Sequence, residues 1–395
     1  MFVKMAFNIR PELLGDEVYE PPEWKNMWFM GFFLLVVGDE AVNLVTTKLP
    51  AILRRYIHLI CILADDNEAS AVFENVKHCF RSALVIGLGV DGCGKNAMVG
   101  YEIIRPMSKE ISFKINKYFN ELKSKYGVIP STFIQLIYAG GTSSSYALAV
   151  SKDIKQLVRS LNSKAQIIDY VSFSRGDYTS QIANSILVTL KLINEVGNRN
   201  SLIISYFDRE PTLRNLSDLN ILNTIITLLL SKYKAGINRI DITDIIGRGG
   251  YFTTNTEYRS VTHLTKIRSI GGEDVFNLAK RAVDFDSGSL HSRAIFSARE
   301  AELVRISVIS PVKITDLEIF GKKFEFVENF MADGFHIPIK YIPISTTAFL
   351  KGNEFAIRQF LRNHRKIVDE AIPELEGYLG MGLIDDEALE SFIRG

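Results

Sequence analysis

The chain has 395 residues, of which 47% are hydrophobic and 23% charged, a balance typical of a globular protein with a sizeable core and long enough for two domains. With 46 Lys and Arg against 45 Asp and Glu, the net charge of +1 provides no overall attraction to nucleic acid or to an anionic membrane. Local sites must therefore carry the function, and we expect no nucleic-acid partner.

The cysteines and the apolar runs exclude further classes of protein. Cys61, Cys79 and Cys93 are odd in number, form no CxxC pair and have no clustered histidine partner, so neither a disulfide framework nor a metal site is supported. This usage fits a reducing cytoplasm. The apolar run 27–37 is shorter than the roughly 20 residues of a membrane-spanning helix, and we interpret it as a buried strand, with no transmembrane segment.

After an arm at residues 1–25, short apolar runs alternate with longer amphipathic stretches. This alternation predicts strands connected by helices, and hence an α/β unit with a mostly parallel sheet covered on both faces. The predicted strands lie near 28–37, 57–64, 82–87, 131–138, 166–173 and 200–206, and the predicted helices near 41–55, 67–79, 98–126, 146–162, 178–196 and 213–233.

The pattern changes in the second half of the chain. The last of those helices, Leu213–Tyr233, is long and apolar, as in helices that link domains or pack between them. A mixed-charge segment at Glu354–Arg394 predicts one or two amphipathic helices, either a solvated face on the body or a partner-binding tail. Glycines at Gly377, Gly380 and Gly382 split this mixed-charge segment. Between the long helix and the mixed-charge segment we predict a smaller α+β domain, with a helix near 272–283 and strands at 303–310, 313–319 and 336–344.

Ligands of parallel sheets bind beyond the carboxyl ends of the strands, and the loop after the third predicted strand is rich in glycine. It reads GLGVDGCGKNAMVG from Gly87 to Gly100. It contains a GxGxxG pattern and also a P-loop pattern at Gly89, Gly94 and Lys95, in which Asn96 replaces the usual Ser or Thr. A phosphate-contacting loop and an ordinary glycine-rich turn are equal alternatives here.

The loop after the fourth predicted strand reads AGGTSSS, from Ala139 to Ser145. Gly140 and Gly141 allow backbone amides to turn toward an anion, Thr142 and the serines add hydroxyl donors, and the following helix N-terminus adds partial positive charge. The loop therefore predicts a phosphate site, with a Ser-capped turn as the alternative.

A third element follows the long helix and contains two acids, Asp241 and Asp244, three residues apart. On a helix they would share one face and polarise a water or hold a cation, although acids also stabilise helix starts without any catalytic role.

In their order and spacing these three elements resemble the tubulin/FtsZ family. The family's third phosphate loop, ending in an NPEVG-like string, is similar to Lys95–Gly100, its GGGTGTG signature to Ala139–Ser145, and its synergy loop to Ile240–Asp244. Weaker similarities extend over nearly the whole chain, at 38–43, 64–69, 205–209, 271–274 and 345–349.

The resemblance implies the tubulin/FtsZ fold: a Rossmann-like GTPase-type domain with a mostly parallel sheet, a long linking helix and a smaller C-terminal α+β domain with a mixed sheet. We place an N-terminal arm at 1–25, the nucleotide-binding domain at 26–212, the helix at 213–237, the second domain at 238–350 and a helical tail at 351–395.

The resemblance also implies a cytoskeletal role, in cell division or cell shape, through protomers that bind GTP or GDP with Mg²⁺ and stack head to tail into filaments. Asp244, and secondarily Asp241, would orient water for attack on the γ-phosphate held by the next subunit. The implied nucleotide-binding residues are Gly38, Asn43, Asp66, Gly92, Gly94, Lys95, Asn96, Gly140, Gly141, Thr142, Ser143, Ser144 and Arg175.

The sequence also departs from the family at three places. Gly38 stands nearly alone in the first loop, beside Asp39 and Glu40, whose carboxylates repel polyphosphate. Thr179 and Phe207 stand where the family places an Arg and an Asn for the nucleoside.

Three hypotheses follow from these similarities and departures. The protein is an assembling GTPase, or a structural or interaction protein of the same fold that does not hydrolyse or bind nucleotide, or an unrelated α/β enzyme that uses Gly87–Lys95 as a dinucleotide site or P-loop. In each, the C-terminal helices offer a surface for a protein partner.

Overall fold

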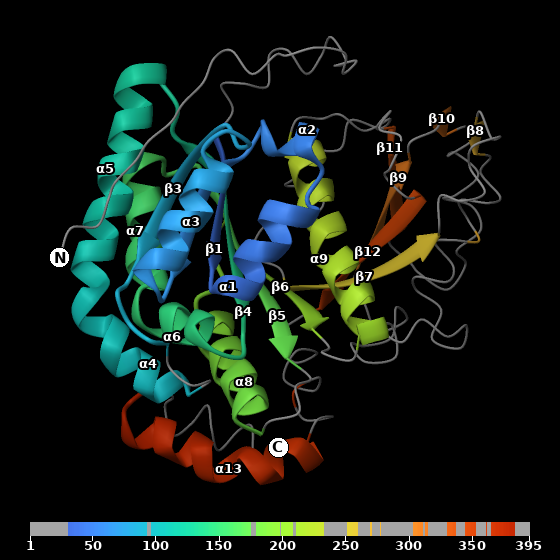
Figure 1. Cartoon of the computed structure of the whole chain (residues 1–395). Helices are drawn as coiled ribbons and strands as arrows, with labels where there is room; N and C mark the ends of the chain where they lie inside the picture. The colour runs from blue at the N-terminus through green and yellow to red at the C-terminus, as the bar shows by residue number, and fades with distance from the viewer. Residues whose placement is uncertain are drawn as a thin grey trace. The chain divides into compact units, whose positions relative to one another are not determined.

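The chain divides into two compact units, Met1–Asn200 with His364–Gly395, and Ser201–Asn363 (Figure 1). The computed structural model describes residues 31–92, 96–174, 179–197, 199–207, 211–232, 251–259, 269–270, 277, 303–310, 313–314, 330–336, 344–352, 361 and 365–383.

The first unit is built on parallel strands in the order β5-β4-β1-β2-β3. All their residues are buried except Ser131, so helices cover both faces, as the apolar runs predict. The predicted α/β architecture is thereby confirmed. The bounds are β1 (Gly31–Val37), β2 (His58–Leu63), β3 (Ser82–Gly87), β4 (Pro130–Tyr138) and β5 (Gln166–Ser174).

The helices of this unit follow the predicted alternation. They are α1 (Asp39–Asn43), a π-helical turn (Leu44–Lys48), α2 (Ala51–Arg54), α3 (Asp66–Val76), α4 (Ala97–Ile104), a 3₁₀ turn (Arg105–Met107), α5 (Ser108–Tyr126), α6 (Thr142–Ala149), α7 (Ser151–Leu161), α8 (Thr179–Ile193) and α13 (Arg365–Gly380). The last of these runs through Gly377 and ends at Gly380, which corrects the split predicted at Gly377.

Three predicted helices are interrupted, which corrects the prediction; the one expected over 146–162 divides at Val150, whose backbone is not helical, into α6 and α7. The helix expected over 98–126 breaks at the 3₁₀ turn containing Pro106, which lacks the N–H group that would continue an α-helix. The helix expected over 41–55 is interrupted at Pro50 for the same reason. The apolar periodicity continues across both prolines, and periodicity alone therefore does not reveal the breaks.

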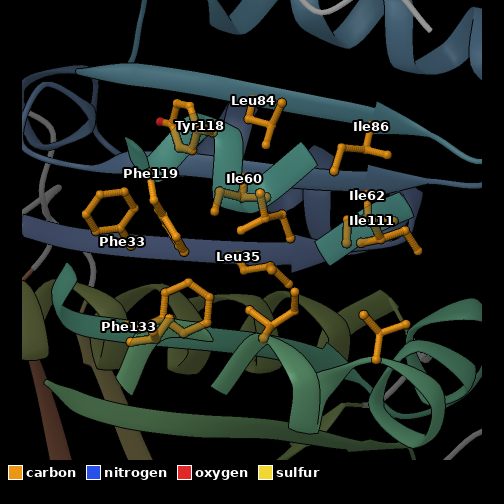
Figure 2. Packing of buried hydrophobic residues seen from close by; sticks show 14 of the residues in the cluster. Phe33, Leu35, Ile60, Ile62, Leu84, Ile86, Ile111, Tyr118, Phe119 and Phe133 are labelled. Atoms are coloured by element: carbon orange, nitrogen blue, oxygen red, sulfur yellow. The ribbon is translucent and has the colours of Figure 1, made fainter. Parts of the chain in front are cut away.

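An aromatic cluster packs α5 against the sheet (Figure 2). The ring centroids of Phe33 on β1 and Phe119 on α5 lie 5.2 Å apart in an edge-to-face arrangement, and those of Phe119 and Phe133 on β4 lie 6.2 Å apart. The α5 residues that face the sheet, with their helical spacing, are Ile111, Ile115, Tyr118, Phe119 and Leu122.

A buried polar network connects four elements of the same unit. Lys155 on α7 donates to Asp169 on β5 at 2.7 Å and lies 2.5 Å from a carboxylate oxygen of Glu195. Gln135 on β4 donates to the other oxygen of Asp169 at 2.8 Å and accepts from the Tyr146 hydroxyl on α6 at 2.8 Å. Burial lowers the pKa of Lys155, but the two carboxylates raise it, and the net direction is upward.

The second unit contains a mixed sheet in the order β11-β9-β12-β7-β6. The last strand, β12, is antiparallel to both neighbours, whereas β11 pairs with β9 and β6 with β7 in parallel. The mixed sheet is as predicted. Bounds are β6 (Asn200–Phe207), α9 (Pro211–Lys232), β7 (Tyr251–Arg259), β8 (Ser269–Ile270), β9 (Leu303–Ser310), β10 (Lys313–Ile314), β11 (Phe330–His336) and β12 (Ile344–Gly352).

Two predictions in this unit agree with the described residues: the long helix is α9, with 22 residues, and the strand predicted at 303–310 is β9. The strand predicted at 336–344 is misplaced, because it shares only His336 with β11 and only Ile344 with β12, with 337–343 outside the described residues. Of the helix predicted near 272–283, the described part is Asn277, which is helical.

We expect Asp169→Asn to lower the free energy of unfolding by about 3 kcal/mol, because it removes the more buried carboxylate facing a buried ammonium group. Glu195→Gln is the matched comparison and should have a smaller effect, since its side chain is 19% exposed against 1% for Asp169. Urea unfolding at pH 7 measures both. Because the pKa of Lys155 is raised, its pairing stabilises the protein fully below the ordinary pKa of 10.5, and this stabilisation is lost as the pH rises through the higher folded-state pKa. Equal effects of the two variants at pH 7 would contradict this account.

Candidate functional site

The loops that follow β1 to β4 meet at the carboxyl edge of the first unit's sheet, where ligands of parallel sheets bind. Backbone hydrogen bonds extend the sheet into these loops. The N–H of Gly38 donates to Ile62 at 2.9 Å, that of Val90 to Ala64 at 3.0 Å, and that of Ala139 to Ser172 at 3.1 Å. Backbone hydrogen bonds therefore tie the bases of these loops to neighbouring segments of the chain.

The loop after β1 is short and acidic. Gly38 has φ +89°, a value that glycine adopts without strain, and α1 begins immediately with Asp39 and Glu40. Asn43, which the family resemblance assigns to nucleotide, is exposed at the C-terminal end of α1, and its carbonyl accepts from the Thr47 hydroxyl at 2.6 Å.

The loop after β2 adds further carboxylates to the same region. Asp65 caps α3 by accepting the N–H of Glu68 at 2.7 Å, and Asp66 is the first residue of the helix. Partial burial raises the pKa of Glu68, and the carboxylates of Asp39 and Asp65 raise it further. The first two loops thus form an acidic border.

The loop after β3 is held closely against α3. A Cβ atom on Gly87 would lie 2.3 Å from Oδ1 and 2.9 Å from Cα of Asp66, so that only glycine fits there. Gly89 and Gly92 have φ +65° and +87°. Asn96 caps α4, its Oδ1 accepting the N–H groups of Met98 at 2.9 Å and Val99 at 3.2 Å.

The loop after β4 leads into α6 at Thr142. No atom lies within 4 Å of where a Cβ on Gly141 would be, and the first N–H groups of α6 begin beside this open space. The hydroxyl of Ser143 donates to the carbonyl of Val37 at 3.0 Å and accepts the N–H of Tyr138 at 3.1 Å, which ties the ends of β1 and β4 together. Ser144 is fully buried.

The structure brings most of the described candidate residues to this one edge, and some of their side chains already have structural partners. The side-chain oxygens of Asn96 and Ser143 form hydrogen bonds inside the protein, whereas Gly140 and Gly141 have only backbone groups to offer a ligand. The candidate residues at this edge are Gly38, Asp66, Gly92, Asn96, Gly140, Gly141, Thr142, Ser143 and Ser144. The candidates Gly94, Lys95, Arg175, Asp241 and Asp244 lie outside the described residues.

Three further residues contribute hydrogen bonds or packing here: Ser145, one of the predicted hydroxyl donors, and two residues of α8 that are absent from the sequence prediction. Ser145 donates to the carbonyl of Ala97 at 3.2 Å and so joins α6 to α4. A Cβ atom on Gly140 would lie 3.6 Å from the Cγ and Cδ atoms of Gln181 on α8. Asn184 of α8 accepts a hydrogen bond from Tyr378 of α13. Ser145 belongs to the AGGTSSS string, but neither Gln181 nor Asn184 lies in a recognisable pattern.

The chemistry of the edge suits a phosphate group beside a cation. Helix N-termini and glycine backbones bind phosphate oxygens, and the open space at Gly141 leaves room for them. The carboxylates of Asp39, Asp65 and Glu68 repel a polyphosphate, and a bound Mg²⁺ would offset this repulsion.

Among the described residues, no group of three or more His, Cys, Asp or Glu is arranged to hold a metal ion. Among the helices of the described ranges, none combines the length and the apolar character required to cross a membrane.

The comparison of Gly87→Ala with Gly141→Ala tests the two kinds of glycine at this edge. We expect Gly87→Ala to lower the free energy of unfolding by about 1–3 kcal/mol, because the new methyl group meets the backbone of Asp66. Gly141→Ala should stay within about 1 kcal/mol, since its surroundings are open. Thermal and urea unfolding measure both, and equal losses would show that Gly87 is not sterically restricted.

No protein-family model matches the sequence, and no curated protein does. Solved structures do match. They include a GTPγS-bound protofilament of CetZ2 from Haloferax volcanii (TM-score 0.57, 12% identity, 86% of this chain and 99% of that one) and FtsZ from M. jannaschii (0.56, 15%, 82% and 92%). TubZ of Clostridium botulinum phage c-st also matches (0.53, 11%, 87% and 98%). These matches give the chain a tubulin/FtsZ-like fold.

Proposed function

We propose that this chain, which has the tubulin/FtsZ-like fold, binds GTP or GDP at the carboxyl edge of its parallel sheet and assembles head to tail into filaments. The observation that carries the proposal is the convergence of glycine-bearing loops and the α6 N-terminus at that edge. The similarity to a GTPγS-bound protofilament of CetZ2 and to a two-stranded TubZ filament supports it.

In this proposal the phosphates contact the backbone of Gly140 and Gly141 and the N-terminus of α6, with Gly92 and Asn96 on the neighbouring loop. Gly94, Lys95 and Arg175 complete the nucleotide contacts. A bound nucleotide would supply the phosphoanhydride bond, and a bound Mg²⁺ would offset the charge of Asp39 and Asp65. The chain's own residues hold the phosphates at a fixed place on the sheet edge.

In this proposal, assembly brings the catalytic acids to the nucleotide. Asp244, assisted by Asp241, comes from the next subunit and positions the attacking water, so hydrolysis depends on the filament contact. Such head-to-tail contacts are heterologous and do not close, which produces filaments. The protein would act in the cytoplasm as a cytoskeletal element.

A second candidate function is a filament or scaffold protein of the same fold that does not hydrolyse nucleotide. The observation in its favour is that side chains at the edge are engaged inside the protein: Asp65 and Asn96 cap helices, and Ser143 joins two strands. An edge used in this way can be retained for folding alone.

Purified protein should hydrolyse GTP at a rate that rises more than proportionally with protein concentration, because the active site is shared between subunits. Asp244→Ala should bind GTP but hydrolyse it about 100-fold more slowly, the scale for loss of a water-positioning base. Phosphate release and pelleting, measured on the same samples, test this. Binding of NAD or ATP instead of GTP would favour a dinucleotide site or P-loop, and assembly without any nucleotide would favour the scaffold.

Asp39→Asn should tighten GTP binding about fivefold at low Mg²⁺, because it removes one of the carboxylates facing the polyphosphate, a surface interaction of roughly 1 kcal/mol. The difference should shrink as Mg²⁺ rises. Glu121→Gln is the control, since it makes the same change near the end of α5, at the opposite edge of the sheet. Fluorescent-nucleotide titration measures both, and equal affinities of Asp39→Asn and wild type at low Mg²⁺ would place the nucleotide elsewhere.

A further inference from the structure

The helix beside the open space of the candidate site, α6, is too short to hold its own geometry. It has 8 residues, and isolated helices shorter than about 12–15 residues are marginal in water. It does not continue into α7, because Val150 between them has a non-helical backbone, with φ −126° and ψ −29°. The direction of the first N–H groups of α6 is therefore set by contacts with its neighbours.

Three hydroxyl groups anchor α6, each to a different element of the first unit. Ser143 donates to the carbonyl of the last residue of β1 at 3.0 Å, and Ser145 donates to that of Ala97, the first residue of α4, at 3.2 Å. The third anchor is deeper. The hydroxyl of Tyr146 donates to Oε1 of Gln135 on β4 at 2.8 Å, and both side chains are fully buried.

The amide of Gln135 has only one favourable way to face Tyr146. Its Nε2 donates to Oδ1 of Asp169 at 2.8 Å and to the hydroxyl of Ser151 at 3.0 Å, which uses both of its N–H groups. The amide oxygen is left to accept from Tyr146. In the reversed amide that oxygen would face the Asp169 carboxylate, and two acceptors with negative charge repel each other.

The orientation of Asp169 is fixed in turn by charge. Its second carboxylate oxygen accepts from Nζ of Lys155 at 2.7 Å, and both residues are buried. Hydrogen bonds in such an environment are strong, and a partner left alone there is costly. A chain of contacts thus runs from α7 through β5 and β4 to Tyr146. It ends about one helical turn after Thr142, where α6 begins beside the open space at Gly141.

We propose that Tyr146 and Gln135 are positioning residues of the phosphate site, which act through α6 by fixing the direction of its first N–H groups. The inference rests on the proposed function, in which these N–H groups contact the phosphates. Hydrogen bonds weaken steeply when the donor turns away from the acceptor, so a small rotation of α6 lowers phosphate affinity. Both side chains are buried and bonded inside the protein, and neither reaches the ligand itself.

Tyr146→Phe in the full chain tests this inference, with Tyr118→Phe as the matched control. Both tyrosines belong to the same buried cluster, and each hydroxyl bonds to a buried side chain, that of Gln135 or of Ser82. Tyr118 lies on α5, and Ser82 is the first residue of β3, at the end of that strand away from the candidate site. Gln135→Met is a second variant, which removes the acceptor and keeps a side chain of similar length.

We expect Tyr146→Phe and Gln135→Met to bind fluorescent GTP about tenfold more weakly, the scale of one lost hydrogen bond, and pyrophosphate to compete about tenfold less well. The KM for GTP should rise by a similar factor while kcat changes by less than about twofold, since the catalytic acids come from the next subunit. Hydrogen exchange over 142–149 should become faster. Tyr118→Phe should match wild type in all four measurements, although urea unfolds it as easily as Tyr146→Phe.

Other results overturn the inference separately from the proposed function. If wild type and Tyr146→Phe bind GTP equally well, or if kcat falls while KM is unchanged, Tyr146 does not position the phosphates, and the proposed function stands. If Tyr118→Phe loses as much affinity, the loss reflects stability alone, and the inference fails again. If neither GTP nor pyrophosphate binds to wild type, the proposed function fails and the inference fails with it.

Discussion

Burial of the parallel sheet on both faces is the constraint on which the rest of the molecule depends. Because helices cover both sides of β1 to β5, the strands consist almost wholly of buried residues, and polar groups reach solvent mainly where strands end. Some of the buried polar side chains satisfy one another, as Gln135, Asp169 and Lys155 do. Chemistry with a ligand is thereby confined to the sheet's edges.

Confinement to an edge makes structural and binding roles compete for the same side chains. Asp65 and Asn96 satisfy the first N–H groups of α3 and α4, and the Ser143 hydroxyl is shared between two strand ends. What remains for an anion is backbone: the glycines and the N-terminus of α6. A site made of backbone groups would depend little on the side chains around it, including the serines that follow Thr142.

How much the sequence predicts depends on the range of the interaction. Continuous apolar runs predict β1 to β5 closely, because their burial is a local pattern, and the glycine loops follow from strand order. The pairing of Lys155 with Asp169 and the contact of Tyr378 with Asn184 leave no local pattern, since they join residues distant in sequence. The continuity of α13 through Pro373 has the same origin: tertiary packing overrides a local preference.

The acidic border has one electrostatic consequence for the two candidate functions. An edge bordered by Asp39 and Asp65 favours polyphosphate only when a cation offsets the carboxylates. The same acids also have a structural role, because Asp65 accepts the N–H of Glu68 at the start of α3 and Asp39 lies in the first turn of α1, where negative charge stabilises a helix. A scaffold of this fold would therefore retain these acids for folding alone, whereas in a nucleotide-dependent filament they would make binding depend on the cation.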